Sequence, residues 1–136
     1  MKRWRFLDYD TDDKPPKNLI LKWYQLQDKA VQAQFSATLI TLEGIEDWID
    51  RDVREFKFFE TGDFAGLGEL RFYIIQHRKK RRFRIPGIWL PDVHQFILLG
   101  GCEKSGRIKI PPNAFEVAMS MKLAWENGRG SVHDHK

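Results

Sequence analysis

Residues 66–85 have the sequence Gly-Leu-Gly-Glu-Leu-Arg-Phe-Tyr-Ile-Ile-Gln-His-Arg-Lys-Lys-Arg-Arg-Phe-Arg-Ile, from which the central part of the architecture can be worked out. Apolar and polar residues alternate along residues 69–74 and again along residues 82–85. Alternate side chains of a strand point to opposite faces, so the segment predicts an antiparallel hairpin with its turn in the polar stretch 77–81. One face of this hairpin is apolar, and on the other face we expect three arginines to converge, Arg71, Arg82 and Arg84.

Three guanidinium groups on one face require an anion nearby. The anion is either external, as a phosphate or an acidic partner, or internal, in which case the arginines pair with Glu69, Asp92 or Glu103. The basic run 78–82 is equally consistent with a solvated hairpin tip. Its aromatic neighbours, Tyr73 and Phe83, can be core residues or surfaces on which bases stack.

The composition is that of one domain with a mild excess of positive charge. The chain has 136 residues and a formal net charge of +4. The excess lies in residues 77–84 and 104–109, which favours nucleic acid or an acidic partner. We expect a single domain over residues 1–128, large enough to bury about two thirds of its unfolded surface, and a flexible tail at residues 129–136.

The sequence also predicts a cytoplasmic protein that has no contact with a membrane. Its longest apolar run is residues 96–99, and its amino terminus lacks the apolar core of a signal peptide. The single cysteine, Cys102, cannot form an intramolecular disulfide, which is typical of a reducing compartment and argues against a zinc site. We therefore expect neither a metal nor a cofactor.

The first half of the chain predicts a strand followed by two helices. A strand fits residues 2–7, and apolar residues at helical spacing predict a helix over 19–26. A second helix begins after Asp28 as its N-cap and ends before Gly44. Residues 45–59 fit either a helical turn or an extended piece.

The second half predicts strands and one more helix. Pro86-Gly87 indicates a bulge or an edge position in the second hairpin strand. A further strand runs through residues 93–99, and a last helix follows Pro111-Pro112 and ends at Gly128. The expected fold is α+β, with the helices on one face of a small antiparallel sheet and the arginines on the opposite face.

These segments, taken in order, resemble the RelE/HigB superfamily of toxins, specifically its phage-derived HigB-like branch. The resemblance rests on the helical hairpin, Gly-Leu-Gly-Glu-Leu-Arg leading into a strand, the Arg-Phe-Arg-Ile strand, the apolar strand ending in Gly-Gly, Lys104, Pro112 and the Ala-rich last helix. It covers roughly residues 19–126. It implies a RelE-like fold with an N-terminal strand and helical hairpin, a small antiparallel sheet and a C-terminal helix.

The function that the resemblance implies is that of the toxin in a toxin–antitoxin system. Such a toxin is a metal-independent endoribonuclease, a hydrolase that cuts mRNA, often at the ribosome, and that a cognate antitoxin protein holds inactive. In the reaction the 2′-hydroxyl attacks the adjacent phosphate, so the site must move protons and stabilise a doubly charged phosphorane. The implied partners are therefore RNA and an antitoxin.

The residues of this chain meet part of that demand. Arg71 and Arg84 match arginines of the family's strands, and Lys104 matches its basic residue after the third strand, so these three are the candidate catalytic residues. Arginine forks onto phosphate oxygens but is a poor proton donor. His77, Lys79, Lys80 and Lys104 are the candidates for proton transfer. The expected RNA-binding residues are Tyr73, His77, Arg78, Lys79, Lys80, Arg81 and Arg82.

One departure from the family pattern supports an alternative function. Several relatives have a tyrosine or histidine near the start of the last helix, where this chain has Phe115, which cannot transfer a proton. The alternative is a non-catalytic protein on the same fold that binds RNA or an acidic partner. His94 is expected to be structural, and Cys102 a buried small side chain or a loop thiol.

Overall fold

A computed structural model describes residues 3–135 and contains three α-helices and eight strands. The helices are α1 (Leu19–Gln25), α2 (Lys29–Glu43) and α3 (Ala114–Glu126). The strands are β1 (Arg5–Asp10), β2 (Phe56–Phe58), β3 (Gly68–Gln76), β4 (Lys79–Leu90), β5 (Gln95–Leu98), β6 (Cys102–Ser105), β7 (Ile108–Ile110) and β8 (Ser131–Asp134). A single turn of 3-10 helix at Pro91–Val93 joins β4 to β5.

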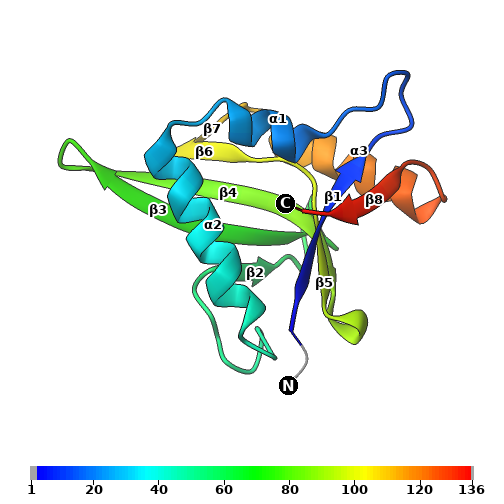
Figure 1. Ribbon diagram of the computed structural model, residues 1–136, viewed down its shortest axis with the longest axis horizontal. Helices are drawn as coiled ribbons and strands as arrows, with labels where there is room; N and C mark the ends of the chain where they lie inside the picture. Colours follow the sequence, from blue (N-terminus) through cyan, green and yellow to red (C-terminus); the bar gives the residue numbers. More distant parts are fainter. Residues whose placement is uncertain (1–2, 136) are drawn as a thin grey trace.

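All eight strands form one mixed sheet in the order β2-β3-β4-β5-β1-β8, and β6 pairs with β4 and carries β7 (Figure 1). Our prediction of a small antiparallel sheet is therefore wrong. Strand β1 lies parallel to β5, with Phe6 opposite Phe96. These residues are far apart in the sequence, so local alternation could not reveal that the two strands pair.

The β3–β4 hairpin has the register that alternation predicted. Arg71 lies opposite Arg84, and Phe72 lies opposite Phe83. His77 and Arg78 form the turn, with φ of 50° and 64°, as a two-residue type I′ turn requires at both positions. The tip of the hairpin projects beyond the rest of the molecule at the left of Figure 1.

Helices α1 and α2 cover the apolar face of this hairpin. Asn18 Oδ1 accepts the N–H of Leu21, and Asp28 Oδ1 accepts the N–H of Val31, so each helix begins at a side-chain cap. The aromatic core on this face packs edge to face or stacked, and it includes Trp23, Phe35, Phe72 and Phe83. The predicted helical hairpin and last helix are confirmed.

Helix α3 packs against the other face of the sheet, which corrects the expectation that all helices lie on one face. Ile88 on β4 and Ile97 on β5 are buried with Phe115 and Ala118 of α3. Both faces of the sheet are thus apolar near β5 and β1, and each needs a helix to cover it. Arg71, Arg82 and Arg84 of the hairpin lie on the α3 face, beyond the region that α3 covers.

Where we expected a flexible tail, Ser131–Asp134 forms strand β8 beside β1. Two ion pairs join the two ends of the chain here, Arg129 with Asp12 at 2.8 Å and Arg5 with Asp134 at 2.6 Å, and two histidines contact aspartates, His133 with Asp10 at 2.9 Å and His135 with Asp8 at 2.6 Å. The aspartates of β1 and the following loop thus find their partners at the other end of the chain.

Pro86 lies inside β4 without a break in the strand, which corrects the expected bulge or edge position. Strand β4 pairs with β6 up to Arg84 and with β5 from Gly87, so Pro86 lies where one partner replaces the other. Its carbonyl accepts the N–H of Leu99 on that side. In an antiparallel strand the N and the C=O of one residue point to the same side. The N of Pro86 therefore faces the gap between β6 and β5, where no backbone hydrogen bond of the sheet needs its missing N–H.

Candidate nucleic-acid interface

A row of one tyrosine and three cations crosses four strands on the α3 side of the hairpin. Arg82 of β4 lies between Tyr73 of β3 and Lys104 of β6, and Lys104 lies opposite Lys109 of β7. Residues directly opposite in neighbouring strands share a face and lie about 5 Å apart. Lys80 adds a further cation, with Nζ 4.2 Å from the centre of the Tyr73 ring. We name these five residues the basic strand face.

Two more arginines lie in the next row toward the body of the sheet and share one carboxylate. Glu69 is only 6% exposed and accepts a hydrogen bond of 2.7 Å from Arg71 Nε, while Arg84 Nε lies 3.7 Å from its other oxygen. Of the internal carboxylates that the sequence offered as partners, Glu69 is therefore the one that Arg71 and Arg84 contact. Burial lowers the pKa of Arg84. The charge of Glu69 raises this pKa, and the charges of Arg71 and Arg82 lower it further. One carboxylate does not neutralise two guanidiniums, so this cluster keeps a positive charge.

A groove of about 640 Å³ joins both rows to the free edge of β3. Strand β2 pairs with β3 only as far as Leu70, so the groove runs where β3 has no neighbour, beside Thr38 of α2. Five basic side chains line it: Arg54, Arg71, Lys80, Arg82 and Arg84. A volume of this size is typical of ligand sites, and the lining favours an anion.

The same groove contains Glu55, a candidate residue that sequence reasoning missed. Its Oε2 is buried and has no hydrogen-bond partner within residues 3–135, although its backbone carbonyl accepts the N–H of Arg71 at 2.8 Å. A carboxylate oxygen without a partner can accept a proton from a bound ligand. Residues 45–59 showed no clear periodicity, so nothing in the sequence placed Glu55 near the hairpin.

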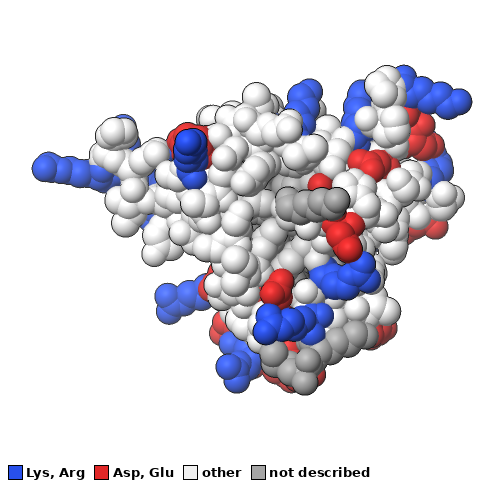
Figure 2. Space-filling view, in the orientation of Figure 1, with Lys and Arg blue, Asp and Glu red and all other residues white. Residues whose placement is uncertain are grey.

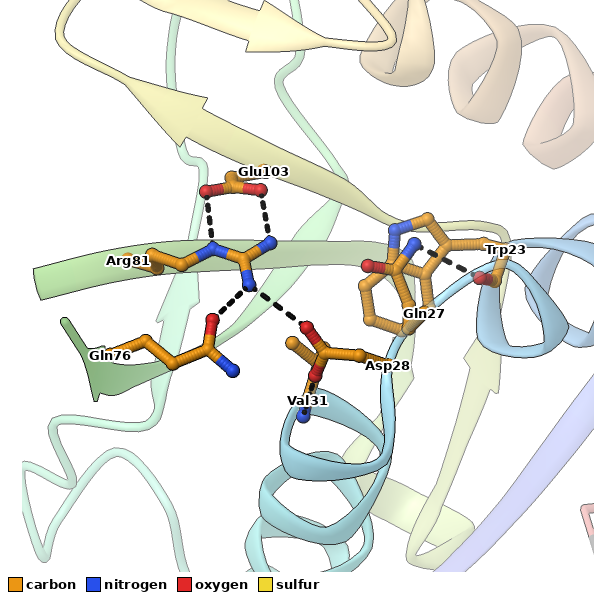
Figure 3. A network of polar contacts seen from close by, with 7 residues as sticks. All are labelled: Trp23, Gln27, Asp28, Val31, Gln76, Arg81 and Glu103. Atoms are coloured by element: carbon orange, nitrogen blue, oxygen red, sulfur yellow. Dashed lines mark hydrogen bonds and ion pairs between the residues drawn. The ribbon is translucent and has the colours of Figure 1, made fainter.

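Arg81, expected to bind RNA, lies on the opposite face and is committed to partners inside the protein (Figure 3). Its Nε and Nη2 donate to the two oxygens of Glu103 at 3.0 and 2.8 Å. Its Nη1 donates to Asp28 at 3.2 Å and to Gln76 at 2.7 Å. Hydrogen bonding to Glu103 raises the pKa of Arg81. Arg81 thus ties the hairpin to β6 and to the N-terminus of α2.

The remaining expected RNA-binding residues do not share one surface. Tyr73, Lys80 and Arg82 belong to the basic strand face, whereas Lys79 has the parity of Arg81 and points to the helix side. His77 and Arg78 are exposed at the turn. Figure 2 shows the side that α1 and α2 cover, on which Lys and Arg side chains are scattered, including at the projecting hairpin tip.

The candidate catalytic residues are only partly brought together. Arg71 and Arg84 are adjacent, but Lys104 lies opposite Arg82, one row away. Cys102 lies opposite Arg84 and is fully buried, and this burial raises the pKa of its thiol to about 11. The thiol therefore stays neutral and unreactive in the folded protein.

Phe115, where a catalytic tyrosine or histidine was considered, is a core residue. Phe115 belongs to α3, and its ring is fully buried. Lys109 Nζ lies 4.2 Å from the centre of the ring. Among residues 3–135, no group of three or more His, Cys, Asp or Glu side chains is arranged to hold a metal ion. No helix in the same range is long and apolar enough to cross a membrane.

Fold and site together define an α+β domain with a mixed sheet, one hairpin of which carries a basic face. No protein-family model matches the chain, and no curated protein or solved structure matches it either. The comparisons therefore leave the resemblance to RelE/HigB toxins as an expectation from the sequence, and the function is argued from the site alone.

Proposed function

We propose that this chain binds single-stranded RNA along the basic strand face. The observation that carries the proposal is the cross-strand row in which Tyr73, 52% exposed, is followed by Arg82, Lys104 and Lys109. Proteins hold single strands by combining a cationic track for the backbone with an aromatic ring on which a base stacks. An acidic peptide would use the cations but not the exposed ring, so the row favours RNA.

Titration of a labelled 12-nucleotide RNA with the protein at several salt concentrations tests this proposal. If about four cations neutralise phosphates, log K should fall against log salt with a slope of about −3. The double variant R82Q/K104Q should bind at least about tenfold more weakly and with a shallower slope. K14Q/K17Q removes the same charge from the loop between β1 and α1 and should bind as the wild type does. Equal losses in both variants, or a salt-insensitive complex, would contradict the proposal.

Cleavage of the bound RNA is a second candidate function, favoured by Glu55. The Glu55 carboxylate can take the proton of a 2′-hydroxyl as the 2′-oxygen forms its bond to phosphorus. Arg71 and Arg84 can stabilise the phosphorane, and Lys80, which lines the same groove, can protonate the departing 5′-oxygen. On this candidate the chain acts as a toxin on mRNA and is held inactive by an antitoxin.

The test for cleavage separates chemistry from binding. Wild-type protein should cut RNA in the presence of EDTA and leave a 2′,3′-cyclic phosphate, and its expression should arrest growth. Glu55→Gln keeps the size of the side chain and should abolish the cut while RNA affinity stays within about twofold. RNA that remains intact with well-folded wild-type protein, or full activity of Glu55→Gln, would eliminate this candidate and leave RNA binding alone.

A further inference from the structure

A second pocket, of about 630 Å³, lies away from the hairpin face and has the opposite charge. Its walls are aromatic and come from the residue before β1, the loop after α2, the end of β4 and the residue before β5: Trp4, Trp48, Trp89 and His94. Its rim carries Glu46, Asp47 and Asp50, and no Lys or Arg of the described chain lines it. We name it the tryptophan pocket.

Two ring nitrogens of this pocket are buried without a hydrogen-bond partner inside residues 3–135: Trp89 Nε1 and His94 Nδ1. The other two indoles of the pocket are satisfied, because Trp4 Nε1 donates to the carbonyl of Glu46 and Trp48 Nε1 to that of Leu42, each at 3.0 Å. A buried donor without an acceptor costs about 1–3 kcal/mol. Trp89 Nε1 and His94 Nδ1 are therefore the polar wall atoms of this pocket that nothing in the described chain satisfies.

Neighbouring rings hold Trp89 in place, and His94 has an unusual backbone conformation. Trp89 packs against Phe56 and Phe58, each with ring centres 5.2 Å apart. His94 has a left-handed φ of 52°, which is strained for a residue with a side chain, and its carbonyl accepts the N–H of Arg5 at 2.8 Å. Backbone strain of this kind concentrates at binding sites, where it fixes a side chain in advance of the ligand.

The carboxylates at the rim form no ion pair in the part of the chain that the structure describes. Asp47 Oδ1 accepts the N–H groups of Ile49 and Asp50, both at 3.0 Å. The pKa of Asp47 is lowered, mainly by the hydrogen bond from the N–H of Asp50. Burial raises this pKa, and the charge of His94 lowers it. In a chain of net charge +4, this rim repels phosphate and attracts a cation.

We propose that the tryptophan pocket binds an organic cation that also carries a carbonyl acceptor, the combination that an arginine residue supplies. The guanidinium would pair with the rim carboxylates and lie against the aromatic walls, and the backbone carbonyl would accept the Trp89 indole N–H. A simple cation would leave Trp89 unpartnered, and an anion would meet the rim carboxylates. The site is separate from the basic strand face, so it does not depend on RNA binding.

Nitrogen-15 NMR titration with N-acetyl-arginine N-methylamide tests the proposal, because each tryptophan indole gives its own resonance. We expect the indole resonance that is missing in Trp89→Phe to shift on binding. Agmatine, which has the guanidinium but no carbonyl, should bind at least about fivefold more weakly, and N-acetyl-glutamate N-methylamide should not bind.

Matched variants distinguish a loss of binding from a failure to fold. Trp89→Phe keeps the ring and should weaken binding of the arginine derivative at least about fivefold, and the exposed double substitution E46Q/D50N should do the same. E60Q/D63N neutralises two exposed carboxylates that do not line the pocket and should leave binding unchanged. Equal binding of the arginine and glutamate derivatives, or unchanged binding in both Trp89→Phe and E46Q/D50N, would overturn the proposal.

A last comparison identifies the source of the ligand. If a peptide with arginine in its middle binds more tightly than the capped single residue, the natural ligand is a segment of a protein partner. If the single residue binds equally well, the natural ligand is a small molecule of the same chemistry.

Discussion

Replacing Arg81 by Gln should destabilise the fold without touching the basic strand face. Arg81 is 27% exposed and makes a double hydrogen bond with Glu103, itself 29% exposed, and a 2.7 Å bond with Gln76. A half-solvated bidentate pair contributes about 1–1.5 kcal/mol and a neutral acceptor about 0.5–1 kcal/mol. The expected loss is about 2 kcal/mol, which lowers the Tm of a domain of this size by roughly 5–10 °C.

Urea unfolding followed by far-ultraviolet circular dichroism measures this loss directly. Arg78→Gln removes the same charge from the exposed turn, where the described chain provides no ion pair, and should change the free energy of unfolding by less than about 0.5 kcal/mol. A loss below about 0.5 kcal/mol for Arg81→Gln as well would show that solvent replaces the Glu103 contact and would refute the assignment of Arg81 to structure.

Three further predictions concern the same sheet. Gly87→Ala should lower the free energy of unfolding by at least about 3 kcal/mol, because a Cβ there would collide with the Phe96 ring; a near-normal denaturation curve would contradict this packing. Replacing His77-Arg78 by Asn-Gly should raise stability by about 1 kcal/mol in thermal melts, since both positions have positive φ. The raised pKa of Cys102, about 11, means that only the unfolded thiol ionises near pH 9–10. Stability present below about pH 9 should therefore decline toward pH 11, by about 2 kcal/mol more in the wild type than in Cys102→Ala, and identical pH profiles would contradict the burial of this thiol.

Local signals were sufficient for the hairpin and the helices. The alternation that places Phe72 and Phe83 on one face also fixed Arg71, Arg82 and Arg84 on the other, because strand parity is decided within a few residues. Asp28 and Gly44 marked the ends of α2 correctly. Signals of this kind depend on neighbours in sequence, which is why they were reliable.

Contacts between distant segments account for what was missed. Strand β8 is polar and exposed, and it forms because residues such as Arg129 and His135 meet aspartates more than a hundred positions away. The same holds for Arg81, whose partners Asp28 and Glu103 lie on α2 and β6. The basic run looked uniform in sequence, but the pleat of the strand sends Arg81 and Arg82 to opposite faces.

That pair of neighbours provides the most direct test of the proposed RNA interface. Arg82→Gln and Arg81→Gln remove the same charge from adjacent positions, so a contribution from net charge alone would weaken RNA binding equally in both. At a temperature where both variants are folded, we expect Arg82→Gln to raise the Kd for single-stranded RNA at least about fivefold and Arg81→Gln to leave it within about twofold. Equal losses, or a larger loss for Arg81→Gln, would contradict the placement of RNA on the basic strand face.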